Sequence, residues 1–131
     1  MIVVDASAVI EVILRTEVGR KLAGRVLDPR QDTHAPHLLD VEVTQVVRRF
    51  ARAREVTDDR ARAALEVLAD LPVTRHPHGL LVPRMWELRH VMTAYDASYV
   101  TLAEVLDATL VTLDGRLAKT RGHRATIELV S

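Results

Sequence analysis

The chain begins Met1-Ile2-Val3-Val4-Asp5-Ala6-Ser7-Ala8, and this stretch decides the class of fold. Residues 2–4 are an uninterrupted β-branched run, which is typical of a strand buried on both faces of a parallel sheet. The run stops at Asp5, and a helical pattern follows at once, for which Ser7 can act as the N-terminal cap. A buried strand that ends in a carboxylate just before a helix predicts an α/β protein with an acidic group at the edge of its sheet.

The rest of the chain continues this alternation. Val43, Val46, Val47 and Phe50 recur at helical spacing and predict an amphipathic helix over residues 38–54. Further helices are expected at 8–14, 18–27, 57–71, 80–89, 96–106 and 116–119, and extended segments or strands at 34–36, 72–76, 109–113 and 125–130. This order predicts an α/β fold with a mostly parallel sheet of four to five strands, formed by a single domain over residues 1–131.

Composition excludes several classes of protein. There is no cysteine, so disulfides, thiolate zinc sites and cysteine nucleophiles are excluded, and a reducing cytoplasmic location is expected. No apolar run approaches the ~20 residues that span a bilayer, and no basic segment precedes the first strand as in a signal peptide, so no membrane association is expected. Aromatic residues make up only 3% of the chain, which leaves few platforms for stacking nucleic-acid bases.

Four acidic residues stand at junctions between apolar elements: Asp5, Glu42, Asp96 and Asp114. Carboxylates gathered in one place repel each other, and burial raises their pKa values further. A divalent cation relieves both effects because hard cations take oxygen ligands. The alternative is that these acids cap helices and close turns, as Asp-Gly at 114–115 commonly does.

Other sites are poorly supported by the residues. The histidines at 34, 37, 76 and 78 match no standard zinc spacing, and no Gly-x-Ser-x-Gly nucleophile elbow is present. A haloacid dehalogenase would need a second Asp two residues after Asp5, where this chain has Ser7. A response-regulator receiver would need an early acidic pair, and Asp5 is alone. Asp40 lies two residues before Glu42 and competes with it as a candidate.

At this point four segments resemble the motifs of PIN domains, and together they look like the VapC toxins of bacterial toxin–antitoxin modules. The first two are Val3-Val4-Asp5-Ala6-Ser7-Ala8 and Pro36-His37-Leu38-Leu39-Asp40-Val41-Glu42-Val43. The others are Tyr95-Asp96-Ala97-Ser98-Tyr99-Val100-Thr101-Leu102-Ala103 and Leu110-Val111-Thr112-Leu113-Asp114-Gly115-Arg116-Leu117. Each motif alone is weak, but the four occur in order over nearly the whole chain.

The resemblance implies a PIN-like three-layer α/β/α fold and an endoribonuclease that depends on Mg²⁺ or Mn²⁺. It implies Asp5, Glu42, Asp96 and Asp114 as the acidic site, a homodimer, and a cognate antitoxin that inhibits the enzyme. Structured tRNA or rRNA is the expected substrate, and operator DNA would be bound only through the antitoxin. The alternative within the family is a catalytically silent PIN domain that binds RNA or acts as a scaffold.

The roles of the site residues are hypotheses. Asp5 and Asp96 are expected to bind the metal directly, Asp114 directly or through water, and Glu42 to bind a second ion or orient the attacking water. Thr112 lies two residues before Asp114 on the same side of its strand and can hydrogen-bond within the acidic group, as can Ser7. Arg116 can contact a substrate phosphate or pair with a surface acid.

A second basic feature is the segment Arg48-Arg49-Phe50-Ala51-Arg52-Ala53-Arg54. The net charge of the chain is zero, so no global field attracts nucleic acid. All 18 basic residues except Lys21 and Lys119 are arginine, whose planar group matches phosphate oxygens. The segment is either such a contact or an ordinary solvated helix face.

Overall fold

The central strand β1 is the first segment of the chain, as its β-branched run predicts. The computed structural model describes residues 1–131 and contains one sheet of five parallel strands in the order β3-β2-β1-β4-β5. Val3 and Val4 are almost completely buried because both faces of β1 are covered. The strands are β1 (Ile2–Val4), β2 (Thr33–Pro36), β3 (Val73–His76), β4 (Thr109–Thr112) and β5 (Thr126–Leu129).

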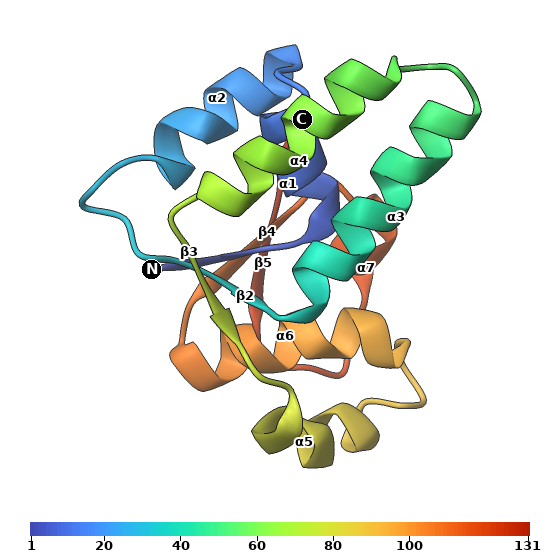
Figure 1. The fold of residues 1–131 in the computed structure, drawn as a ribbon. Coiled ribbons are helices and arrows are strands. Elements are labelled where there is room, and N and C mark those ends of the chain that lie inside the picture. The colour runs from blue at the N-terminus through green and yellow to red at the C-terminus, as the bar shows by residue number, and fades with distance from the viewer.

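Helices cover both faces of the sheet and make three layers (Figure 1). The four helices α1 to α4 lie on one face, and α6 packs on the other with α5 beside it. The helices are α1 (Ala6–Ile13), α2 (Glu17–Val26), α3 (Leu38–Arg52), α4 (Asp58–Asp70), α5 (Val82–Glu87), α6 (Ala94–Leu106) and α7 (Gly115–Lys119), with a 3₁₀ turn η1 (Gly79–Leu81) before α5. None of the helices combines the length and apolar character needed to cross a membrane.

The predicted α/β class and three-layer arrangement are confirmed, and the sheet is parallel throughout. The extended segment at 34–36 is a full strand of the sheet, paired with both β1 and β3. The predicted helix at 80–89 is divided into η1 and the shorter α5. Pro83 lacks an N–H donor and lies in the first turn of α5, a position where no helical hydrogen bond is lost.

One local prediction was wrong. Asp5, and not Ser7, is the N-terminal cap of α1: its backbone is extended and its carboxylate accepts a hydrogen bond from the Ala8 N–H. Asp5 already follows the strand with extended geometry, so the helix begins one residue later, at Ala6. Ser7 therefore lies in the first turn, where its hydroxyl is available for other contacts.

The topology places the predicted site at one edge of the sheet. In a parallel sheet all strands end at the same edge, and ligands bind beyond it. The paired strands β1 and β4 have Val4 beside Val111, so Asp5 and Thr112 follow side by side. Asp114 lies just beyond β4, and α3 starts just beyond β2, which brings Glu42 to the same edge.

Candidate active site

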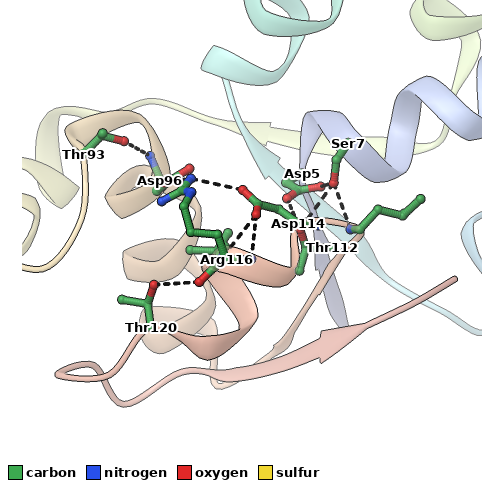
Figure 2. Close-up of polar contacts among 10 residues, drawn as sticks. Asp5, Ser7, Thr93, Asp96, Thr112, Asp114, Arg116 and Thr120 are labelled. Carbon is green, nitrogen blue, oxygen red and sulfur yellow. Dashed lines mark hydrogen bonds and ion pairs between the residues drawn. The ribbon is translucent and has the colours of Figure 1, made fainter.

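Asp5 is held by two hydroxyl groups at the ends of the central strands (Figure 2). The Ser7 hydroxyl donates to Oδ1 over 2.6 Å, and the Thr112 hydroxyl donates to Oδ2. Both hydroxyl oxygens also accept from the backbone, Ser7 from the Leu113 N–H and Thr112 from the Asp114 N–H. Ser7 and Thr112 thus fix the orientation of Asp5 and connect it to the backbone that carries Asp114.

Burial makes the charged form of Asp5 unfavourable. Only 6% of Asp5 is exposed, and desolvation raises the pKa of its carboxyl group. Hydrogen bonds from Ser7, Thr112 and the Ala8 N–H lower this pKa, while repulsion from Asp114 raises it, and the net change is upward. Asp5 is therefore an acid whose ionised state needs further positive charge.

Arg116 joins the next two acids. One of its terminal nitrogens, Nη2, lies 2.9 Å from Oδ2 of Asp96 and 3.1 Å from Oδ2 of Asp114 (Figure 2). Asp96 is in the first turn of α6, and Asp114 caps α7 by accepting from the Arg116 and Leu117 N–H groups. The guanidinium group thus serves as a counter-charge between two carboxylates that come from separate elements.

Glu42 completes the acidic group on the other side. The Tyr99 hydroxyl donates to Glu42 Oε1 over 2.6 Å. Desolvation raises the pKa of Glu42, repulsion from Asp96 and Asp5 raises it further, and the Tyr99 hydrogen bond lowers it only in part. Burial and the Glu42 charge also raise the pKa of Tyr99, so Tyr99 remains a hydrogen-bond donor.

Hydrogen bonds and ion pairs thus connect the elements that carry the four acids, which lie far apart in the sequence. Their donor atoms are all carboxylate oxygens, which suit a hard cation such as Mg²⁺ or Mn²⁺. In the present arrangement, no three acidic or histidine side chains are close enough to enclose an ion. The donor set therefore fits a divalent cation in chemistry, and we expect ion binding to require Arg116 to move away from Asp96 and Asp114.

Tyr99 is a further residue of this site, and the sequence named it only within the third PIN motif without predicting a role for it. A signal was present, because Tyr99 lies three residues after Asp96 and so shares a helix face with it. Asp40, the competing acid, pairs with Arg75 at 3.0 Å. His34 and His76 contact each other on β2 and β3, with Nδ1 and Nε2 2.9 Å apart.

The protein is a parallel α/β/α sandwich, and carboxylates held by hydroxyl groups lie at the carboxyl edge of its sheet. These two features define the class of protein as an α/β fold with an acidic site at the sheet edge. The sequence profile described as "PIN domain" matches residues 2–123. The chain belongs to the PIN domain family and, within it, to the VapC ribonucleases, because its similarity to them extends over its full length.

Three curated relatives come from Mycobacterium tuberculosis. Ribonuclease VapC1 is 43% identical over 98% of this chain and 96% of its own length. Ribonuclease VapC12 is 40% identical over 100% of both chains, and Ribonuclease VapC9 is 41% identical over 99% of this chain and 98% of its own.

Solved structures share the fold. PAE2754 from Pyrobaculum aerophilum is 28% identical with a TM-score of 0.67, over 96% of this chain and 82% of its own. The sarcin-ricin loop cleaving toxin VapC20 of Mycobacterium tuberculosis gives a TM-score of 0.64 at 16% identity, over 90% of this chain and 93% of its own. VapBC2 from Rickettsia felis, bound to a DNA fragment from its promoter, gives 0.66 at 12% identity over 98% of both.

Proposed function

We propose that this chain is the toxin of a toxin–antitoxin pair and an endoribonuclease that hydrolyses phosphodiester bonds in structured RNA. The observation that carries the proposal is the meeting of Asp5, Glu42, Asp96 and Asp114 at one sheet edge, in a chain about 40% identical to VapC ribonucleases. A group of neighbouring carboxylates repels RNA and cannot help to bind it unless a cation joins the group.

The cation proposed for this site is Mg²⁺, with Mn²⁺ as a substitute. When bound, it supplies an activated water nucleophile and neutralises charge on the phosphate oxygens. Asp5 and Asp96 would hold it directly, Asp114 directly or through water, and Glu42 would orient the attacking water or hold a second ion. Ser7 and Thr112 keep the Asp5 carboxylate in one orientation through their hydroxyl hydrogen bonds.

Arg116 has two roles in this proposal. In the arrangement described here it neutralises Asp96 and Asp114 through one nitrogen atom. Its side chain is 64% exposed and long enough to swing away from both acids. Once released, its planar group would donate to a phosphate oxygen of the RNA, a contact for which arginine is well suited.

The proposed partners follow from the family. A cognate antitoxin would block the site, a homodimer would be the working form, and operator DNA would be bound only through the antitoxin. The neighbouring VapBC2 structure is a complex of that kind with promoter DNA. Light scattering tests the homodimer, and a monomer at all concentrations would remove it from the proposal.

Sequencing of RNA ends after expression of the wild type and of Asp96→Ala tests the activity. Wild type should produce new ends at one defined position in a tRNA or rRNA, whereas Asp96→Ala should reduce cleavage more than about 100-fold, because it removes a metal ligand. Asp59→Ala is the matched control, since Asp59 is also a first-turn acid but lies on α4 without an ion pair, and it should cleave like the wild type.

The second candidate function is an RNA-binding or scaffolding PIN domain without catalysis. It would be favoured if the wild type and Asp96→Ala gave the same RNA ends while both still bound RNA. The complete set of four acids opposes it, because their mutual repulsion has no benefit in a silent domain.

A further inference from the structure

Four arginines at the end of α3 and in the turn after it lack the acidic partners that six other arginines of this protein have. All four are exposed: Arg48, Arg49, Arg52 and Arg54. None of them takes part in an ion pair or a side-chain hydrogen bond. By contrast, Arg25 forms a two-pronged pair with Glu128, and the Arg75 guanidinium is held by Asp40 and by backbone carbonyl groups.

Three of these residues, Arg48, Arg52 and Arg54, surround a hollow and are called here the arginine cluster. The hollow has a volume of about 720 Å³ and opens between the end of α3 and the start of α4. Asp58 is the one acid that lines it, and it forms no ion pair with any of the three. The charged residues that line the hollow are therefore three arginines and one acid, and no ion pair joins them.

Arg54 has a backbone conformation that favours glycine. Arg54 has a φ of 58°, in the left-handed region, and its N–H bonds back to the Ala51 carbonyl. Glycine is the favoured residue at such a helix end because any Cβ is strained there. An arginine at this position gives up stability and adds positive charge to the cluster.

The arginine cluster and the acidic site are linked by α3. Glu42 lies near the start of this helix at the site, and Arg52 is ten residues further on, about 15 Å along the axis. Figure 1 shows α3 running from the sheet edge to the turn that leads into α4. The intervening exposed residues include Gln45 and Arg49, so a nucleic-acid strand would meet no acidic side chain on α3 after Glu42.

We propose that the arginine cluster binds the phosphate backbone of the RNA substrate at a distance from the bond that is cut. The inference rests on the proposed function, which requires positive charge that attracts RNA to the protein. The acidic site repels RNA, and the zero net charge of the chain provides no general attraction. The cluster supplies local positive charge about 15 Å from Glu42 along α3.

The test measures the binding of fluorescently labelled bulk tRNA to Asp96→Ala protein, which does not cut it, over a range of salt concentrations. Adding Arg48→Gln and Arg52→Gln should weaken binding about ten-fold or more and reduce the salt slope by about one for each lost phosphate contact. Glutamine keeps the helix propensity of α3, so the fold should be retained.

Arg20→Gln with Arg121→Gln is the matched control, because it removes the same charge from two exposed arginines outside α3 that also form no ion pair. It should leave the affinity within about two-fold and the salt slope unchanged. Equal affinity and slope in the cluster variant and its parent would overturn the proposal. A cluster variant that binds tRNA normally but no longer binds poly-L-glutamate would also overturn it. That result would identify the cluster as a site for an acidic protein segment.

Cleavage of bulk tRNA by chains that retain Asp96 separates this inference from the proposed function. Arg48→Gln with Arg52→Gln should raise KM with little change in kcat, because a remote phosphate contact binds substrate and transition state equally. No cleavage by the wild type would overturn the function and this inference with it. Cleavage with the same KM in the double variant would overturn the inference alone.

Arg54→Gly should change stability and tRNA binding in opposite directions. Relief of the left-handed strain should raise the melting temperature by a few degrees, while loss of one guanidinium group should weaken tRNA binding and reduce the salt slope by about one. A variant that is more stable and binds equally well would remove Arg54 from the RNA site.

Discussion

At the scale of single residues, three of the four carboxylates of the acidic site are each held by a donor from another element. Thr112 of β4 holds Asp5, Tyr99 of α6 holds Glu42, and Arg116 of α7 holds Asp96. Such donors fix geometry and reduce repulsion but do not remove it, since the pKa values of Asp5 and Glu42 are still raised. The site is thus prepared for a cation without being neutral.

Arg116→Gln should increase the affinity for Mn²⁺ several-fold. The guanidinium group competes with the ion for Asp96 and Asp114, so its removal frees both carboxylates. Electron paramagnetic resonance of free Mn²⁺ gives the affinity without reference to activity. RNA cleavage should nevertheless become slower, because the proposed phosphate contact is lost.

Arg121→Gln is the control for this change, since Arg121 is exposed nearby in sequence and has no ion pair. Its Mn²⁺ affinity should stay at the wild-type level. Weaker Mn²⁺ binding in Arg116→Gln than in this control would mean that Arg116 supports the metal site and does not compete with it.

Tyr99→Phe should leave Glu42 without its hydroxyl donor and raise its pKa further. We expect a loss of about 1 kcal/mol in the free energy of unfolding, typical of one hydrogen bond, and a loss of activity that is larger near neutral pH than at higher pH. Urea unfolding and a pH profile of RNA cleavage measure the two effects. An unchanged pH profile would limit Tyr99 to packing.

At the scale of elements, the close approach of α1 and α2 depends on Gly19. A Cβ atom at Gly19 would lie 1.8 Å from the backbone oxygen of Glu11, a distance that no packing arrangement allows. The Gly19 N–H also donates to Thr16, which caps α2. The two helices can therefore pack only because residue 19 has no side chain.

Gly19→Ala should lower the free energy of unfolding by about 2 kcal/mol or more, because the overlap forces α2 away from α1. This loss should occur although alanine is the better helix former by about 1 kcal/mol. Gly24→Ala in the same helix is the matched control, since nothing lies within 4 Å of its added Cβ, and it should be stabilising. Urea unfolding measures the free energy of unfolding of both variants. Equal changes in the two variants would contradict the packing argument.

Helix α6 carries a residue of the acidic site and also packs against the sheet. Its first turn presents Asp96, and the residues from Ala97 to Ala103 are buried against the sheet. Near its end, the side chain of Glu104 is 5% exposed and accepts from Arg84 of α5 at 3.0 Å. Burial alone would raise the pKa of Glu104, but the arginine partners and the Arg124 N–H lower it overall. This anchor fixes the helix that carries Asp96.

At the scale of the whole molecule, the raised pKa values of Asp5 and Glu42 couple stability to pH and to metal. Below the ordinary values of 3.8 and 4.5 these groups are protonated in both the folded and the unfolded chain, and they have no effect. As pH rises above those values, the unfolded chain loses its protons first, so the folded state is penalised. The penalty becomes constant once the pH passes the raised pKa values.

Asp5→Asn combined with Glu42→Gln should therefore gain stability relative to the wild type as pH rises from about 4, in the absence of metal. Mg²⁺ should raise the melting temperature of the wild type, and more at a pH of about 8 than of about 5, because it binds the ionised carboxylates. Differential scanning calorimetry measures both. An equal effect of Mg²⁺ on the double variant would show that the ion binds elsewhere.

The sequence alone determined the class of fold, and it predicted the four acids of the proposed site. Its hydrophobic periods identify strands and helices because they record which residues face a core, and the motifs around Asp5, Glu42, Asp96 and Asp114 mark the ends of those elements. The tertiary structure alone decided the partners: that Arg116 lies between Asp96 and Asp114, that Tyr99 holds Glu42, and that Asp5 caps α1. The physical reason is separation along the chain. Periodicity depends on residues that are close in sequence, whereas a contact between residues 42 and 99 depends on how whole elements pack.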